Sequence, residues 1–390
     1  MAKIKIMKKL STLTILFIFF NLIQANSQTP DWVWARSAQS GITGWGEAVS
    51  IATDQSENIF VAGQYRDTII FGSHVLTGAQ EGVYLTKYDT YGNIKWAKGD
   101  ISANILNCWT GGICTDSSGN CYLVGYFNDT VSFDSFTLIS SGINDAIFLV
   151  KYDPSGNVLW AKSAGGSGMD DCYGVTTDPW GNIYLTGNYG SSLFVLDWDT
   201  LINTGSGTNI FVAKYDSSGN LLWAKNAVGT GQDRGYSVAT DVLGNVILTG
   251  SFYSHIITFG PYVLNHVNGS GANIFVVKYD SSGNILWANK AGGTNDDIAY
   301  HVITDALGNI YVTGYFSSWP MLFGTDTLFL AGNVDVFLVK YNPFGSIAWV
   351  KSFGNDSEEG YCVTTDKYGR IYLTGFFHST ITIDTIPLQL

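Results

Sequence analysis

The sequence is poor in charge, proline and cysteine, and these shortages narrow the choice of fold. Only 13% of its 390 residues are Asp, Glu, Lys or Arg and 46% are hydrophobic, a composition that excludes a disordered chain. Seven prolines against 45 glycines favour many tight turns. Aromatic residues make up 14% of the chain, which is typical of half-buried and fully buried β-strands.

Catalytic and metal-binding motifs are also missing. The sequence contains no G-x-S-x-G, no H-E-x-x-H and no phosphate-binding glycine loop. The five histidines are scattered without a metal-ligand spacing. No catalytic residue is therefore predicted, and no cofactor is evident.

A membrane-length apolar run is absent, and the one apolar stretch lies at the N-terminus. Four lysines precede the stretch from Leu10 to Leu22, and small residues surround a cut after Ser27. This pattern predicts a signal peptide over residues 1–27 and a mature domain over 28–390, secreted or held at the surface of a bacterial envelope. The alternative is an uncleaved anchor, for which the apolar run is short.

Positive charge is scarce as well. Cleavage after Ser27 would remove four lysines and no acid, so the net charge would go from −12 to −16. Such an acidic chain should repel phosphate backbones, so nucleic acid is not expected as a partner. Five cysteines leave at least one thiol unpaired in a monomer, the expected state, and the pairing stays open.

What the sequence has is a repeat of about 63 residues. Three anchors share this period: a tryptophan in a WAK-like segment, a glycine closing a GNIYLTG-like run, and the lysine of a KY pair. The tryptophans are Trp34, Trp96, Trp160, Trp223, Trp287 and Trp349.

Each repeat predicts four short strands joined by D-x-x-G-N turns. In the unit ending at Trp223, strands are expected over 173–177, 183–189, 210–215 and 221–225. These strands are apolar on both faces, so each sheet should lie between two neighbours, as in an all-β propeller of four-stranded blades. The extra residues between the second and third strands, such as 258–264, predict an added hairpin or edge strand.

The recurring TD-x-x-GN-x-Y-x-TG and D-x-F-x-x-KYD-x-x-GN-x-x-WAK patterns resemble the bacterial β-propeller repeat family described as SBBP. The resemblance covers the whole mature chain and implies a secreted or surface propeller. It supplies no catalytic residue.

The six visible copies are not all complete. The last copy stops after its first two strands and the start of the insert, and the N-terminus offers only one fourth strand, over 32–36. Two explanations stay open: the chain is truncated at its C-terminus, which we favour, or the N-terminal strand completes the last blade.

Function is expected on the loops that enter each first strand, because these loops vary between copies whereas the D-x-x-G-N turns do not. They carry acids and tryptophans that should surround one mouth of a central channel. The ligand-binding candidates are Trp45, Glu47, Trp109, Asp170, Asp171, Asp233, Asp296, Asp297, Glu358 and Glu359. The alternative is that each acid caps a turn and stays solvated.

Two classes of function follow from these loops. The first is a non-enzymatic binding or structural module for a protein or glycan, with Ca²⁺ as a candidate ion. The second is a polysaccharide hydrolase or lyase that uses carboxylates from different blades at the channel mouth. Which residues would bind a metal is unknown.

Overall fold

The chain divides into two compact units, Met1–Arg36 and Ser37–Leu390. In the computed structural model, the described residues are 33–41, 44–78, 81–99, 101–102, 108–141, 144–267, 269–378, 381–383 and 386–388. The predicted signal peptide over 1–27 lies outside the described residues. Within the described part, no helix has the length and apolar character that crossing a membrane requires.

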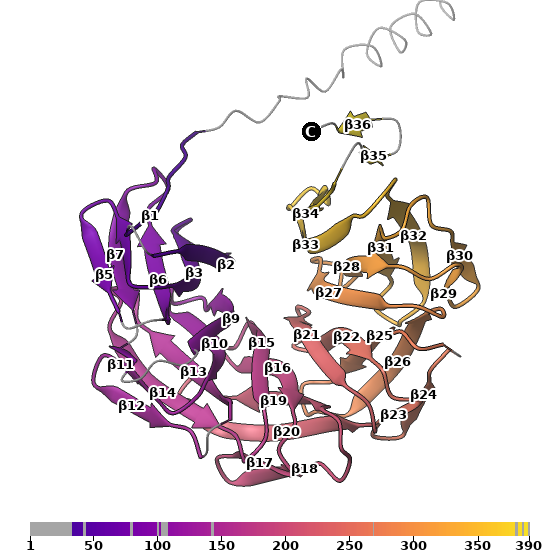
Figure 1. Ribbon diagram of the computed structural model, residues 1–390, viewed down its shortest axis with the longest axis horizontal. Helices are drawn as coiled ribbons and strands as arrows, with labels where there is room; N and C mark the ends of the chain where they lie inside the picture. Colours follow the sequence, from indigo (N-terminus) through magenta and orange to yellow (C-terminus); the bar gives the residue numbers. More distant parts are fainter. Residues whose placement is uncertain are drawn as a thin grey trace, which may run out of the picture. The chain divides into compact units, whose positions relative to one another are not determined.

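The second unit is built from antiparallel four-stranded sheets that follow one another in sequence order (Figure 1). Within each sheet, the first, second, third and fourth strands of a repeat pair in succession. The five such sheets are β2-β3-β6-β7, β9-β10-β13-β14, β15-β16-β19-β20, β21-β22-β25-β26 and β27-β28-β31-β32, and β33-β34 forms a two-stranded sixth. This is the predicted all-β propeller architecture.

The first strands lie next to one another at the inner edge of the sheets. They are β2 (Gly46–Thr53), β9 (Cys108–Thr115), β15 (Asp170–Thr177), β21 (Asp233–Thr240), β27 (Asp297–Thr304) and β33 (Glu359–Thr365). The second strands are β3 (Ile59–Tyr65), β10 (Cys121–Phe127), β16 (Ile183–Tyr189), β22 (Val246–Phe252), β28 (Ile310–Phe316) and β34 (Ile371–Phe376).

The third strands are almost entirely buried, whereas most residues of the fourth strands are half-buried or exposed. The third strands are β6 (Gly82–Tyr88), β13 (Ala146–Tyr152), β19 (Asn209–Tyr215), β25 (Asn273–Tyr279) and β31 (Asp335–Tyr341). The fourth strands are β7 (Ile94–Gly99), β14 (Val158–Ala164), β20 (Leu221–Val228), β26 (Ile285–Gly292) and β32 (Ile347–Phe353).

The periodic glycine of the second strand has a steric cause. A β-bulge interrupts each first strand, for example between Cys172 and Gly174, and brings a first-strand carbonyl close to the second strand. A Cβ on Gly187 would lie 1.9 Å from the carbonyl oxygen of Asp171, and the equivalent glycines of the other sheets meet similar contacts. Only glycine fits at this position.

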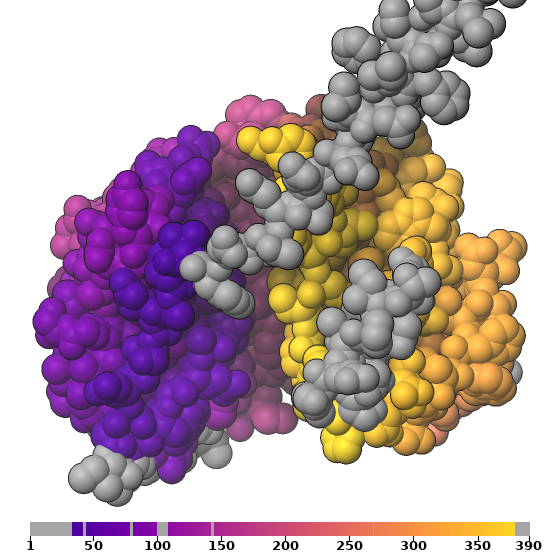
Figure 2. Space-filling view, turned by 90° about the horizontal axis from the view of Figure 1, so that it is seen from above, coloured from indigo at the N-terminus to yellow at the C-terminus, as the bar shows by residue number. Residues whose placement is uncertain are grey.

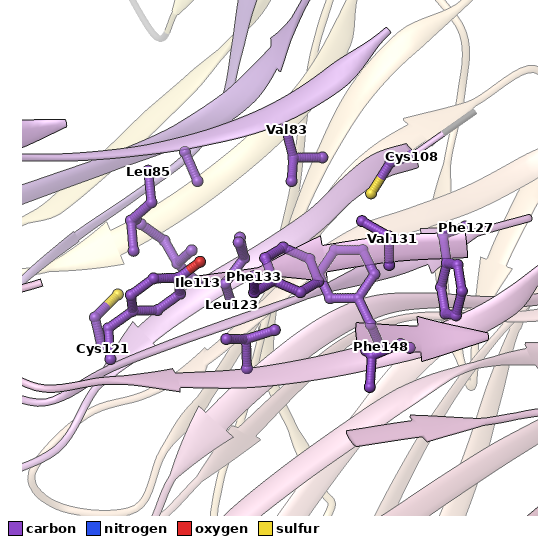
Figure 3. Packing of buried hydrophobic residues seen from close by; sticks show 14 of the residues in the cluster. Val83, Leu85, Cys108, Ile113, Cys121, Leu123, Phe127, Val131, Phe133 and Phe148 are labelled. Atoms are coloured by element: carbon purple, nitrogen blue, oxygen red, sulfur yellow. The ribbon is translucent and has the colours of Figure 1, made fainter. Parts of the chain in front are cut away.

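The hydrophobic core lies between successive sheets. Between the first two sheets, Val83 and Leu85 of β6 face Phe127 of β10 and Phe148 of β13 (Figure 3). A sheet that lies between two neighbours therefore buries both faces, which explains why its strands lack the alternation of a sheet with one solvent-exposed side.

The insert between second and third strands is a hairpin, as the sequence predicts for 258–264, and it adds a connection to the preceding sheet. The hairpins are β4 (Thr68–Phe71) with β5 (His74–Thr77), β11 (Thr130–Phe133) with β12 (Phe136–Ile139), β17 (Leu193–Leu196) with β18 (Asp199–Ile202), β23 (Ile256–Phe259) with β24 (Tyr262–Asn265), β29 (Met321–Phe323) with β30 (Asp326–Leu328), and β35 (Ile381–Ile383) with β36 (Ile386–Leu388). β23 pairs with the end of β20, and β29 pairs with the end of β26. A hairpin from one repeat thus extends the outer edge of the repeat before it.

The periodic lysine and tryptophan also join neighbouring sheets. Lys214 Nζ and Trp223 Nε1 both donate to the carbonyl oxygen of Ser281 in the next sheet, at 2.9 and 3.2 Å. Lys278 and Trp287 share the carbonyl oxygen of Pro343 in the same way. Two of the three sequence anchors therefore recur because they bind one backbone atom of the following repeat.

The predicted strand over 32–36 is not found, because Val33–Arg36 has no regular secondary structure. The first described strand is β1 (Gln39–Ser40), which pairs with β4, and β8 (Ile101–Ser102) pairs with β11 in the same manner. These short strands form where an insert hairpin offers a hydrogen-bonding edge. The first and last sheets of the unit reach the surface (Figure 2), with Ile51 of β2 and Tyr372 of β34 exposed.

Candidate functional site

Each sheet has two ends, which we name from their connections. The turn end carries the D-x-x-G-N turns, and the loop end carries the connections that enter the first and third strands. At the turn end, Asp178 accepts hydrogen bonds from the backbone N–H groups of Trp180 and Asn182 and from the Asn182 amide and Tyr184 hydroxyl. Gly181 has a φ of 82°, which glycine adopts without strain. The aspartate thus caps its own turn.

A cavity of about 540 Å³ lies at the turn end of five first strands. It is lined by Thr53, Asp54, Gln55, Thr115, Asp116, Ser117, Thr177, Asp178, Pro179, Thr240, Asp241, Val242, Thr304, Asp305 and Ala306. The threonine hydroxyls donate across the sheets, as from Thr177 to the carbonyl oxygen of Thr115 at 2.9 Å. Because the threonine hydroxyls bind neighbouring sheets and the aspartates bind their own turns, we assign the cavity a structural role.

At the loop end, the predicted acids separate into two groups. The first group, Asp170, Asp233, Asp297 and Glu358, is fully buried. Asp170 accepts hydrogen bonds from the Ser191 hydroxyl and from the backbone N–H groups of Gly166, Gly190 and Ser191, at 2.7–3.1 Å. Asp233 and Asp297 bind Ser254 and Ser318 in the same way. These acids hold loops, as the capping alternative states, but they are not solvated.

Burial and hydrogen bonding shift the pKa values of these acids in opposite directions. Burial raises the pKa of Asp170 and of Asp297 to about 6, although hydrogen bonds from their serine partners oppose the shift. Burial likewise raises the pKa of Asp233.

The second group consists of Asp171, Asp296 and Glu359, which lie beside tyrosine hydroxyls. They are close to a series of aromatic rings, which we call the loop-end wall. Its rings are Trp109, Tyr126, Tyr173, Tyr236, Tyr300 and Tyr361. Successive ring centroids lie 5.6–6.4 Å apart, so the rings form one continuous row over five sheets. Tyr361, at one end, is half exposed.

Carboxylates border this row of rings. Tyr173 donates its hydroxyl to Asp171 at 3.0 Å, and Tyr300 lies 3.4 Å from Glu359. Tyr253, which lies close enough to Tyr236 to interact with it, donates to Asp296 at 2.8 Å. Burial, followed by the negative charge of Asp171, raises the pKa of Asp145, so Asp145 and Asp171 lie close enough to interact.

Three amide side chains bind acids near the wall, and all three do so through their nitrogen. Asn188 donates to Asp171 at 3.0 Å, Gln64 to Glu47 at 3.4 Å, and Asn128 to Asp145 at 3.3 Å. The amide oxygens of Asn188, Gln64 and Asn128 are buried and have no hydrogen-bond partner among the described residues. The unsatisfied groups are therefore acceptors.

The structure brings together only part of the predicted set. Trp109, Asp171, Asp296 and Glu359 lie on the wall, and Glu47 lies on the first sheet beside Gln64. Trp45 precedes β2, is partly buried, and makes no ring contact among the described residues. Ligand binding by any of these residues stays a prediction.

Sequence reasoning missed the tyrosines. Tyr173, Tyr236, Tyr300 and Tyr361 each follow a buried acid by three residues, as in D-D-C-Y and D-R-G-Y. This spacing could have been read from the sequence, since it recurs in four consecutive repeats. Asn188, Gln64 and Asn128 carry no comparable signal.

Metal and thiol chemistry has little support in the described part of the chain. No group of three or more His, Cys, Asp or Glu side chains there is arranged to hold a metal ion. All five cysteines are free thiols, and burial raises the pKa of Cys172 and Cys114. A buried thiol with a raised pKa is unreactive.

Comparison with known proteins supports a repeat protein. No family model matches the chain. It is 26% identical over 441 aligned residues to the uncharacterized WD repeat-containing protein L264 of Acanthamoeba polyphaga mimivirus, covering 90% of this chain and 31% of that protein. It is 29% identical over 173 residues to the regulatory protein FlaEY of Caulobacter vibrioides, covering 42% of this chain and 18% of that protein. The chain spans about a third or less of these relatives.

Solved structures align over most of the chain but at low similarity. The WD40 domain of Neurospora crassa Pan2 covers 85% of this chain and 89% of its own, with a TM-score of 0.41 and 12% identity. A protein of unknown function from Bacteroides caccae covers 79% and 82%, with a TM-score of 0.37 and 12% identity. The sheets, their order and the repeat thus describe a β-propeller repeat protein.

Proposed function

We propose that this chain is a binding module of a secreted or surface protein of the SBBP type, and that its ligand binds at the loop-end wall. The observation that carries the proposal is the continuous row of aromatic rings bordered by Asp171, Asp296 and Glu359. Aromatic rings with polar tips give large contact area at low entropic cost. WD-repeat similarity is consistent with a binding or scaffold role.

A pair of alanine variants tests this proposal. Tyr236→Ala with Tyr300→Ala interrupts the row at its centre, and Tyr91→Ala removes an exposed tyrosine at the turn end as the matched control. The probes are a printed oligosaccharide array and an array of synthetic peptides of varied charge.

We expect the unmodified chain and Tyr91→Ala to bind the same array members and the double variant to lose them. Thermal melting of each variant verifies that it is folded. Binding that survives in the folded double variant, or no binding by any form, contradicts the proposal.

The polysaccharide hydrolase or lyase is the second candidate. The neighbouring carboxyl groups of Asp145 and Asp171 favour it, since burial and then the charge of Asp171 raise the pKa of Asp145, the direction that a general acid beside a second carboxylate requires. For this candidate we expect polysaccharides to release reducing ends or unsaturated products, and we expect Asp145→Asn to abolish that release.

Ca²⁺ binding by the acidic loops also stays a prediction, which calorimetric titration with CaCl₂ tests.

A further inference from the structure

We infer that the ligand of the loop-end wall is cationic, namely a lysine- or arginine-bearing segment of another protein. This inference rests on the proposed function and specifies the chemistry of the ligand. Three independent features of the wall support it: its unsatisfied acceptors, its excess of carboxylates and its aromatic faces.

The first feature is the orientation of the amides. Asn188 is 2% exposed and Gln64 is 6% exposed, and each amide nitrogen is fixed on a carboxylate. Turning either amide over would place an oxygen against an oxygen, so the arrangement leaves the amide oxygen without a donor. Asn128 repeats the arrangement on Asp145. The oxygens are buried and each amide nitrogen is held by a carboxylate, so these amides offer no free donor to a ligand.

The second feature is the charge of the wall. Four carboxylates, those of Asp145, Asp171, Asp296 and Glu359, border it, whereas Arg234 is the cation placed among its rings. The tyrosine hydroxyls of Tyr173 and Tyr253 already donate to acids. The carboxylates of the wall therefore outnumber its cation, which suits lysine and arginine, since both side chains are cationic and donate without accepting.

The third feature is the aromatic row itself. Cations are attracted to aromatic faces, and the aliphatic stems of lysine and arginine pack on the same rings. A neutral sugar would also stack on these rings, but its hydroxyl oxygens need donors as well as acceptors. Arg234, with its Nη1 3.5 Å from the Tyr236 hydroxyl, is the cation at the centre of the row that could supply them. The net charge of −12 further favours encounter with a basic partner.

Calorimetry with defined probes tests the inference on the full chain. The probes are deca-lysine, deca-glutamate and cellohexaose, each titrated at low and at moderate salt. The test variant is Asp171→Asn with Glu359→Gln, which removes two wall carboxylates. The matched control is Asp326→Asn with Glu57→Gln, which removes the same charge from exposed positions away from the wall.

We expect deca-lysine alone to bind, with an affinity that salt weakens and that the wall variant lowers by about tenfold or more. The control variant should bind within about twofold of the unmodified chain, because exposed distant charges are screened. Equal losses in the two variants would show nonspecific attraction and overturn the inference.

Other outcomes separate this inference from the proposed function. Binding of cellohexaose or deca-glutamate that depends on Tyr236 and Tyr300 overturns the cationic ligand but leaves the binding wall standing. No binding of any probe here, together with no binding on the arrays, removes both. Circular dichroism and thermal melting of every variant show that a lost signal comes from the wall and not from unfolding.

Discussion

At both ends of a sheet an aspartate accepts hydrogen bonds from backbone N–H groups, but the two aspartates differ in how deeply they are buried. At the turn end, Asp216 accepts hydrogen bonds from Ser218 and Asn220; burial would raise its pKa, but these bonds lower it overall. At the loop end, Asp170 also accepts backbone hydrogen bonds, yet burial raises its pKa to about 6. The pKa of a capping aspartate is thus lowered where the residue is exposed to water and raised where it is buried.

The largest expected effect tests whether the turn-end acids are purely local caps. Asp241 binds the N–H groups of Leu243 and Asn245 and pairs with the buried ammonium of Lys278 at 2.9 Å. We expect Asp241→Ala to lower the free energy of unfolding by about 3–5 kcal/mol, because it leaves Lys278 buried without its counter-ion. Urea unfolding measures the loss.

The control for this prediction is Asp216→Ala, which removes the same cap from an exposed turn. It should cost about 1 kcal/mol, the value of a lost cap without a buried charge. Equal losses in the two variants would mean that the ion pair contributes nothing and that the cap alone matters.

A smaller effect is expected where the two strands meet at the bulge. A Cβ on Gly250 would lie 2.0 Å from the carbonyl oxygen of Arg234. Gly250→Ala should lower the free energy of unfolding by about 1–3 kcal/mol through forced backbone movement. Gly369→Ala is the comparison, since a Cβ there meets no atom within 4 Å although its φ is 76°. A larger loss for Gly369→Ala, measured by the same urea unfolding, would contradict the steric account of the periodic glycine.

The smallest expected effect is a difference in pH dependence between the two ends. Because the pKa of Asp170 is raised in the folded chain, its contribution to stability is present below about pH 4 and is lost as the pH rises through about 6. The stability of the unmodified chain relative to Asp170→Asn should therefore fall by about 2 kcal/mol between these values.

Asp216→Asn should show the opposite sign, because the pKa of Asp216 is lowered. The contribution of Asp216 is present above about pH 4 and is lost as the pH falls further. Thermal melting across this range measures both slopes, and slopes of the same sign would remove the contrast between the ends.

Sequence patterns predicted most of the fold. The strands over 183–189 and 210–215 agree with β16 and β19 to within one residue, and the insert over 258–264 is the hairpin β23-β24. The strand expected over 32–36 was wrong for Val33–Arg36, since a strand depends on a partner edge that local composition does not show. The candidate site was predicted less well: the loops were located, but burial of Asp170, Asp233 and Asp297 was not foreseen.

By itself, the sequence determined the repeat, the all-β architecture and the D-x-x-G-N turns, because these depend on local propensity and on a period that recurs along the chain. Only the tertiary structure decided which acid of an adjacent pair is buried and which faces the tyrosines. Asp170 and Asp171 are neighbours, yet they point to opposite sides of one strand, so one holds a loop and the other reaches the wall. That choice depends on what lies on each side of the strand: Ser191, 21 residues away, binds Asp170, and Asn188, 17 residues away, binds Asp171.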